Sequence, residues 1–417
     1  MALNFKEPHI IRATYRIVTP MFIGDAEQKA SGISPASVKG ALRFWWRALM
    51  WGKIRSQPQY SSDREALKCL HKEEADLFGT SADNGKAAAF TLRVTSENLK
   101  ITRVGTEHPD FKNTPAARYL GYGLMEAFAS REKNTKAGQL TRDCINEDQT
   151  FTVTLTSFNA FDDVLKQTLM LFGLVGGLGS RTRHGMGSVV LEALHEKQPK
   201  QEEKLIWSAS KTSQEYTVSI QGILSNLATL SLPPFSAFSN ETRIDLLEKS
   251  TTPYNVLNVF GRKMLLYRSW GKDGKVLNEP SEKRFKADHD WSKGDRLNDF
   301  HPKRVVFGLP HNYGKKETQH VTPEKHRDPY PTGVYKHERR AGPLLFHVHK
   351  IGTEYIGVSL LLPATFLPHG ERINAGGTNV PANIEWSILT DFLDGRDNKG
   401  KIRFDSKQSI LSGVAIR

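Results

Sequence analysis

Apolar and polar residues alternate with a period of two in several short segments of the first half of the chain. In residues 9–19 the side chains of Ile11, Ala13, Tyr15 and Ile17 share one face. Because successive side chains of a strand point to opposite faces, this pattern predicts a strand with one buried side. Strands are predicted at residues 9–19, 87–95, 150–157 and 188–191.

Other segments of the first half repeat their apolar residues at helical spacing. Helices are predicted at residues 34–51, 65–78 and 164–175. The first of them begins with Ser34 and Pro35, a pair that suits a helix N-terminus. Strands and helices then follow in the order β-α-β-β-α-β with one additional helix, which predicts a ferredoxin-like (RRM-like) domain.

The second half has a less regular pattern. Its predicted elements are strands at 216–223 and 304–309, a hairpin of strands 343–350 and 355–362 around Gly352, and helices at 252–270 and 384–393. This order suits a degenerate second copy of the first fold. We therefore expect an α+β protein of two tandem ferredoxin-like domains with insertions.

The expected domains are residues 1–200 and 201–417, and the polar segment 196–204 is expected to link them. The long polar segment 98–148 is expected to be an insertion into the first domain. A segment of that length without a clear pattern is expected to be mobile unless it clasps a ligand or partner.

Composition and charge narrow the classes of partner. Lys and Arg number 58 against 45 Asp and Glu, which gives a net charge of +13 and favours a polyanionic partner. Two cysteines, Cys69 and Cys144, are too few for a disulfide framework or a zinc site. No run of 18 apolar residues and no signal sequence is present, so we expect a soluble, cytoplasmic protein without a membrane partner.

The predicted helix 34–51 carries Lys39, Arg43 and Arg47 at intervals of four residues, which places them in one row. Like charges in a row repel, and a bound phosphate backbone would favour the arrangement. A solvated helix face is the alternative interpretation. Of the adjacent tryptophans, Trp46 is the better candidate for stacking on a base, because both indoles cannot face the core fully.

A glycine-rich stretch, residues 174–188, follows the helix 164–175 and precedes a strand. Phosphate-binding loops for mononucleotides and dinucleotides run from strand to helix instead, so this order excludes them. Backbone N–H groups that glycine makes accessible, together with arginines, suit an extended phosphodiester backbone. An ordinary loop with a glycine cap remains the alternative. The candidate residues here are Gly177, Gly179, Ser180, Arg181, Arg183 and His184.

Three further groups of residues are candidates for chemistry. His184 is the best candidate for a titratable base, although a phosphate contact or a packed side chain is the commoner role for such a histidine. The triplet Asp288, His289 and Asp290 is expected to be structural, since no second motif completes a metal site. Arg339 and Arg340 are expected to be the basic contribution of the second domain.

Two of these stretches resemble a known family. Residues 32–49 resemble the first-helix signature of the RAMP proteins of type III-B CRISPR effectors, the Cmr complexes, and residues 176–188 resemble the RAMP glycine-rich loop. The likeness is greatest to the first-numbered subunit. Residues 74–79, 288–290 and 339–343 are weaker marks. His184 stands where many relatives carry another basic residue, and Ala341 and Gly342 stand where a Ser is expected.

The resemblance implies tandem ferredoxin-like domains at one end of an RNA-guided antiviral complex. It implies contact with guide or target RNA near the 3′ end of the guide, beside other RAMP subunits, and no catalytic residue, metal or cofactor. One alternative is a metal-independent endoribonuclease that matures guide RNA, with His184 as base and Arg181 or Arg183 on the phosphate. Another is a structural adaptor whose basic face meets acidic proteins.

Overall fold

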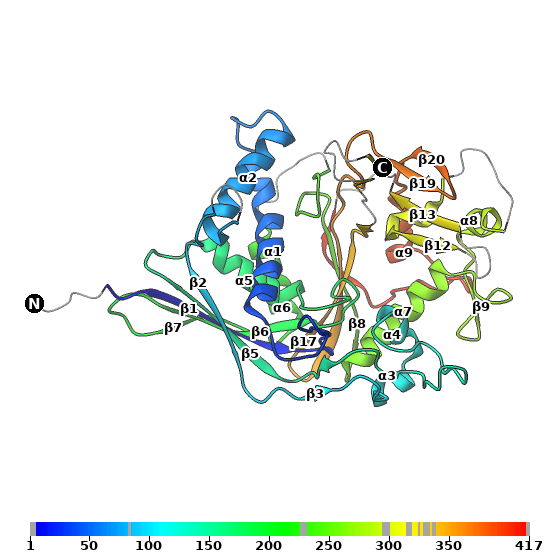
Figure 1. Ribbon diagram of the computed structural model, residues 1–417, viewed down its shortest axis with the longest axis horizontal. Helices are drawn as coiled ribbons and strands as arrows, with labels where there is room; N and C mark the ends of the chain where they lie inside the picture. The colour runs from blue at the N-terminus through cyan, green and yellow to red at the C-terminus, as the bar shows by residue number, and fades with distance from the viewer. Residues whose placement is uncertain are drawn as a thin grey trace, which may run out of the picture.

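The computed structural model describes residues 6–413 except 82–84, 226–231, 294–300, 314–318, 324–325, 328–333 and 336–338. It is a mixed α/β structure whose sheets are antiparallel. No helix in these ranges is long and apolar enough to cross a bilayer. Figure 1 shows two main sheets that meet in the middle of the molecule, with helices packed against each.

The first sheet confirms the four strands predicted in the first half. Its strands are β1 (His9–Ile17), β2 (Thr91–Ser96), β5 (Thr150–Ser157), β6 (Val189–Lys197) and β7 (Lys204–Ser208), in the spatial order β2-β5-β1-β6-β7. The predicted face of β1 is buried, from Ile11 to Ile17. The polar segment 196–204 is the turn of the β6–β7 hairpin, and the expected boundary at residue 200 lies inside that turn.

Helices cover one face of the first sheet (Figure 1). They are α1 (Pro35–Arg55), α2 (Asp63–Phe78) and α5 (Asp163–Val175). Ser34 caps α1 as predicted, because its hydroxyl accepts the N–H of Ala36 at 3.2 Å. α2 begins with a capping box between Ser62 and Glu65. Aromatic and aliphatic side chains from these helices form one hydrophobic core with the buried face of the sheet.

The second sheet consists of β8 (Arg243–Ser250), β17 (Leu344–Ile351), β18 (Glu354–Leu361) and β21 (Gln408–Ser412), in the order β17-β18-β8-β21. β17 and β18 form the predicted hairpin around Gly352. Helices α7 (Pro253–Arg268) and α9 (Ser387–Asp394) share a hydrophobic cluster with this sheet. Within that cluster Phe260 of α7 stacks on Phe346 of β17, with ring centroids 3.8 Å apart.

Two predictions for the second half were wrong. Residues 216–223 belong to a helix, α6 (Ser213–Ile223), because Thr212 caps its N-terminus and Tyr216, Ile220 and Leu224 recur at helical spacing on its buried side. The expected strand 304–309 is a 3₁₀ helix, η1 (Lys303–Phe307), followed by the short strand β11 (Gly308–Leu309). In both places a short apolar run suited either a strand or a helix.

Smaller elements complete the described chain. A third sheet joins β12 (His311–Tyr313), β13 (Gln319–Pro323), β19 (Arg372–Ala375) and β20 (Thr378–Pro381). Short pairs are β3 (Ile101–Thr102) with β4 (Cys144–Ile145), β9 (Lys275–Val276) with β10 (Glu279–Pro280), β11 with β16 (Arg340–Ala341), and β14 (His326–Arg327) with β15 (Val334–Tyr335). Short helices are α3 (Pro109–Asn113), α4 (Pro115–Leu120) and α8 (Lys286–Trp291).

The insertion 98–148 packs against the second half of the same chain. Its helix α4 lies against α7, where the side-chain oxygen of Asn258 accepts the N–H of Ala116 at 3.0 Å. A Cβ at Gly261 would come within 2.4 Å of the Ala116 carbonyl, so glycine permits this close approach. The insertion therefore clasps part of its own chain.

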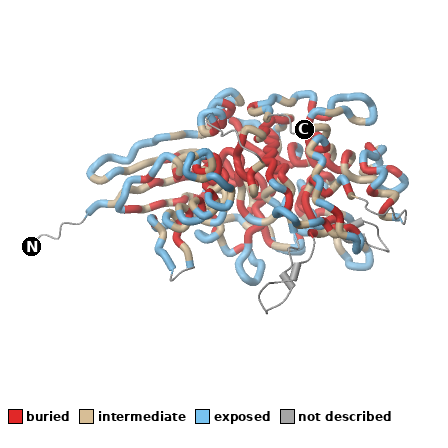
Figure 2. Tube along the Cα trace, turned by 90° about the horizontal axis from the view of Figure 1, so that it is seen from above, coloured by how far each residue is buried: buried red, intermediate tan, exposed pale blue. Residues whose placement is uncertain are grey.

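The two halves are joined by continuous buried surface. The second sheet is covered on both sides, because Leu345, Val358 and Leu360 pack in the core of the first half while Phe346 and Val348 pack against α7 and α9. Figure 2 shows buried residues continuing through the middle of the molecule, whereas exposed residues follow the outer loops. The relative placement of surface residues from the two halves is thereby fixed.

Candidate nucleic-acid interface

The basic row on α1 is partly neutralised within the protein. Arg43 Nε and Arg47 Nη1 donate to the same oxygen of Glu74, at 2.6 and 2.9 Å. Glu74 lies on α2 with only 3% of its side chain exposed, whereas about a third of each arginine side chain is exposed. This buried carboxylate holds the two guanidiniums together within the protein. Two arginines against one carboxylate still leave a net positive charge on the α1 surface.

Lys39 and Trp46 have different surroundings. Lys39 is half-buried on the same row and has no ion-pair partner among the described residues. Trp46 is only 3% exposed and packs its indole edge-on against Phe78, with ring centroids 6.0 Å apart. The prediction that Trp46 stacks on a base was therefore wrong, because α2 covers it. Phe44, two residues earlier and half-buried, borders the surface instead.

The glycine-rich stretch, residues 174–188, packs closely against neighbouring backbone, and we call it the joint. A Cβ at Gly177 would lie 2.6 Å from the Gly187 carbonyl oxygen, and one at Gly179, whose φ is +87°, would lie 2.5 Å from the Phe22 carbonyl oxygen. The Ser180 N–H donates to the same Phe22 oxygen at 2.8 Å. This N–H is therefore bonded within the protein rather than free for a phosphate. Much of the loop backbone bonds to neighbouring protein, so the side chains remain for a ligand.

Arg181 and Arg183 point to different partners. Arg181, exposed and with a φ of +62°, donates through Nε to the Tyr122 carbonyl at 2.9 Å. Arg183 donates through Nη1 to the Gly342 carbonyl at 2.9 Å, and its guanidinium carbon lies 5.5 Å from the Phe44 ring centroid. Burial, with a smaller contribution from the charge of Arg340, lowers the pKa of Arg183 to about 10. Both side chains remain cationic at neutral pH.

His184 is packed into the joint. Its Nδ1 lies 3.1 Å from the Leu120 carbonyl oxygen, so Nδ1 carries the proton, because a carbonyl can only accept. Removal of water from the ring is the main cause that lowers its pKa to about 4, and the charges of Arg181, Arg268 and Arg183 add to the effect. His184 is therefore neutral at physiological pH. The residues on either side of it contact Phe346 of β17. The Arg183 carbonyl accepts the Phe346 N–H, and Gly185 lies close to the Phe346 ring.

Arg339 and Arg340 approach this joint from the second half. Arg340 donates to the Thr365 carbonyl at 2.9 Å, and its guanidinium carbon lies 5.7 Å from the Phe366 ring centroid. Arg339 is exposed. Burial lowers the pKa of Arg181, and the charge of Arg339 lowers it further, which places these two cations near each other. The sequence prediction that the second half adds a basic pair here fits this placement.

A groove of about 880 Å³ brings several of these cations together. Arg47 of α1, Arg183 of the glycine-rich stretch and Arg340 of β16 line it, although they are far apart in sequence. Arg64 and Lys68 of α2 also line it, and neither has an ion-pair partner among the described residues. The remaining lining residues are Phe44, Leu67, Leu70, His71, Glu74, Phe235 and Ser236. We call this the α1–α2 groove.

Sequence reasoning missed Arg64 and Lys68. Together with His71 they recur at intervals of four and three residues and are exposed on α2. That spacing was a signal as strong as the row on α1. A smaller cavity of about 280 Å³ lies between α1 and the glycine-rich stretch, lined by Gly177, Gly179 and Thr182, and it shares Phe44 and Arg183 with the groove.

Asp288 and Asp290 of the triplet at 288–290 have structural partners, as predicted. Asp288 is buried and accepts the backbone N–H groups of Lys303 and Arg304, both at 3.0 Å. His289 stacks on Trp270, and Asp290 pairs with Lys286. The three side chains thus have separate partners. Among the described residues, no group of three or more His, Cys, Asp or Glu side chains is arranged to hold a metal ion.

Comparison with known proteins agrees with the first-half architecture. Residues 14–190, from β1 through the glycine-rich stretch into β6, match the model of the RAMP superfamily. This part of the chain therefore resembles a RAMP domain. The chain is similar to the CRISPR system Cmr subunit Cmr1-2 of Pyrococcus furiosus, with 28% identity over 43% of this chain and 93% of that protein. It is also 24% identical to Cmr1-1 of the same organism, over 84% of this chain and 87% of that protein.

A solved structure shares the overall fold. The apo crystal structure of Cmr1 from Pyrococcus furiosus superposes with a TM-score of 0.53 and 17% identity, over 97% of this chain and 99% of that one. The likeness extends well beyond the RAMP match into the second half. The chain thus resembles Cmr1 in sequence and in fold, and its residues 14–190 match the RAMP superfamily.

Proposed function

We propose that this protein is a non-catalytic, RNA-binding subunit of a type III-B CRISPR effector. In this role it binds guide or target RNA near the 3′ end of the guide, beside other RAMP subunits of the complex. The similarity to two Cmr subunits supports the assignment to that class of effector. The net charge of +13 supports a polyanionic partner.

The α1–α2 groove carries the proposal. Cations from α1, α2, the glycine-rich stretch and β16 converge on one surface, and the aromatic rings of Phe44 and Phe235 lie among them. Arginine guanidiniums bind phosphate oxygens in a planar fork, and aromatic rings stack on unpaired bases. A single RNA strand supplies both chemical groups along its length. A small anion would use only one end of a groove of this size.

We also propose that the two main sheets are tandem ferredoxin-like domains. In chain order the first sheet is β1-α1-β2-β5-α5-β6 and the second is β8-α7-β17-β18-α9-β21. Numbered within each copy, the four strands have the same spatial order, 2-3-1-4, and neighbouring strands are antiparallel in both. The shared order supports two copies of one fold.

His184 supports a role without catalysis. A general base works best when its pKa lies near the operating pH, and the pKa of His184 is lowered to about 4. Its Nδ1 proton is held by the Leu120 carbonyl. These two features suit a histidine that stabilises the joint between the halves, and they do not suit a base that titrates at neutral pH.

One experiment tests the proposal. The protein is incubated with a labelled single-stranded repeat RNA in EDTA, and both binding and cleavage of the RNA are measured. If three to five phosphates are neutralised, the slope of log affinity against log salt is expected to be roughly −2 to −4, taking about −0.7 per contact. The RNA is expected to stay intact. Specific cutting that disappears in His184→Ala would establish the endoribonuclease alternative, and absence of RNA binding would favour an adaptor for acidic proteins.

A further inference from the structure

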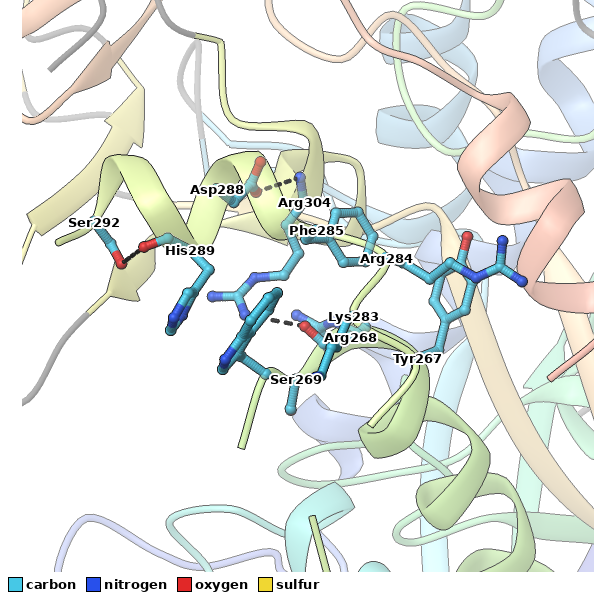
Figure 3. Close-up of a pocket in the computed structure, with 11 residues that line it drawn as sticks. Tyr267, Arg268, Ser269, Lys283, Arg284, Phe285, Asp288, His289, Ser292 and Arg304 are labelled. Atoms are coloured by element: carbon cyan, nitrogen blue, oxygen red, sulfur yellow. Dashed lines mark hydrogen bonds between the residues drawn. The ribbon is translucent and has the colours of Figure 1, made fainter. Parts of the chain in front are cut away.

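A third pocket lies in the C-terminal half, and it shares no lining residue with the α1–α2 groove or with the cavity beside the glycine-rich stretch. It has a volume of about 200 Å³ and is formed where the end of α7 meets α8 and η1. Figure 3 shows the side chains of Lys283, His289 and Arg304 gathered between these segments. Neither the RAMP match, which ends at residue 190, nor the proposed groove includes any of these residues.

Two aromatic rings form a stack in this pocket. Trp270 and His289 have ring centroids 4.1 Å apart and an angle of 8° between their planes. Burial is the main cause that lowers the pKa of His289, so its ring is an uncharged aromatic plane at neutral pH. Both residues are half-buried, so the stack lies at the surface with part of its area accessible to a ligand.

Cations surround the stack. Lys283 is exposed, its Nζ lies 5.6 Å from the Trp270 ring centroid, and it has no ion-pair partner among the described residues. Arg268 and Arg304 also line the pocket, as does Arg284, which pairs with Glu282 and Asp391. Asp288, the one carboxylate among the described lining residues, accepts the backbone N–H groups of Lys303 and Arg304. The pocket therefore has an excess of positive charge beside an aromatic plane.

The pocket is connected to the α1–α2 groove through short elements. Arg304 lies on η1, which leads directly into β11, and Leu309 of β11 pairs with Arg340 of β16, a residue of the groove. Arg268, at the other wall of the pocket, lies close enough to His184 for its charge to contribute to the lowered pKa of that histidine. Cationic side chains are thus found in the groove, beside the glycine-rich stretch and in the pocket.

We propose that this pocket binds one unpaired nucleotide of the RNA strand that lies in the α1–α2 groove. The base continues the Trp270–His289 stack, and its phosphate contacts Lys283 and the neighbouring arginines. A volume of about 200 Å³ admits a single base but not a duplex or a larger ligand. An acidic peptide would use the cations but not the stacked rings. The inference rests on the proposed RNA-binding function and adds a specific base-binding site to it.

The test compares a fluorescent single-stranded RNA with a strand of equal length in which abasic spacers replace the nucleosides. Trp270→Ala is expected to weaken binding of the RNA by roughly 5- to 100-fold, the range for loss of one base–aromatic stack, and to leave binding of the abasic strand unchanged. Trp270→Phe keeps an aromatic plane and is expected to retain most of the affinity. Its melting temperature and that of the alanine variant report whether the fold persists.

Lys283→Glu tests the phosphate contact without touching the core, since Lys283 is exposed. It is expected to weaken binding of both strands, whereas Lys133→Glu, the same change at an exposed lysine that does not line the pocket, is expected to weaken neither. The base-binding site would be overturned if Lys283→Glu and Lys133→Glu bound RNA with equal affinity. It would also be overturned if the RNA affinity of Trp270→Ala stayed within about two-fold of the wild type. Failure of the wild-type protein to bind either strand would instead refute the RNA-binding function itself.

Discussion

Glu74 shows how a single buried carboxylate can organise a basic surface. It holds Arg43 and Arg47 in place while leaving part of each guanidinium exposed. Such a bridge stabilises the packing of α1 on α2 but also reduces the charge available to a polyanion. Loss of the bridge is therefore expected to lower stability and to raise RNA affinity, so one substitution can distinguish the two effects.

Glu74→Gln is expected to lower the free energy of unfolding by about 1–3 kcal/mol, because a neutral amide replaces the charged acceptor of two hydrogen bonds. The same change adds one net positive charge beside the α1–α2 groove and is expected to tighten RNA binding. Urea denaturation and anisotropy titrations measure the two quantities. Glu73→Gln, one position away on α2, is the matched control, and equal effects of the two variants would show that the bridge is unimportant.

At the scale of single elements, α2 contributes more to the groove than its sequence suggested. Arg64 and Lys68 are exposed and line the groove, whereas Lys72 is exposed on the same helix but does not line it. The helix is anchored by its capping box and by the buried side chains of Ala66, Leu70 and Phe78. Charge changes on its outer surface are therefore expected to leave the fold intact, within about ±0.5 kcal/mol.

The double variant Arg64→Glu/Lys68→Glu is expected to weaken RNA binding and to make the salt slope shallower by about 1.4, since each lost phosphate contact removes roughly 0.7. Lys72→Glu/Lys133→Glu makes the same change in net charge outside the groove. If the two double variants bind RNA equally, attraction depends on overall charge and the groove has no special role.

The glycine-rich stretch offers a second prediction at this scale. Gly179→Ala is expected to destabilise the protein by more than about 1 kcal/mol, because alanine is strained at positive φ and its Cβ would meet the Phe22 carbonyl. Gly40→Ala, at an exposed position inside α1 with nothing within 4 Å of a Cβ, is expected to stabilise by about 0.5–1 kcal/mol. Thermal unfolding of both variants checks the contrast; a neutral Gly179→Ala would mean that the loop relaxes easily.

For the whole molecule, the contact between the halves is predicted to be sensitive to acid. His347 and His349 lie buried on β17, with Nε2 of the first and Nδ1 of the second 3.3 Å apart, and Tyr216 of α6 packs against the His349 ring. Burial lowers the pKa of His347 to about 3. The unfolded chain takes up the proton near pH 6.5 and the folded chain does not, so stability falls as pH decreases through that range.

Between pH 7.5 and pH 5 this difference is expected to cost about 2 kcal/mol for each such histidine. His347→Gln removes the titrating group, and its loss of stability over the same interval is expected to be smaller by about that amount. Urea titrations at both pH values measure the effect, with His195→Gln, on the partly exposed part of β6, as the control. Identical pH dependence of wild type and His347→Gln would show that His347 is not kept neutral by the fold.

The sequence alone determined most of the first half. Alternation predicted β1 with the correct buried face, Ser34 and Pro35 marked the start of α1, and helical spacing predicted α2 and α5. These signals are local, and one side of each element faces water, so the pattern is clear. In the second half the main sheet is covered on both faces, and its strands are apolar on both sides, which weakens the alternation. Residues 216–223 of α6 were mistaken for a strand because so short an apolar run suits either element.

Only the tertiary structure decided which charges are available. Glu74 lies 31 residues from Arg43, and no local pattern shows that it would bridge the basic row. Burial of Trp46 depended on Phe78 of another helix, and the convergence of Arg47, Arg183 and Arg340 depended on the packing of the two halves. Charge composition favoured a polyanionic partner, but the surface that could receive it is made by long-range contacts, because burial and ion pairing depend on residues that are distant in sequence.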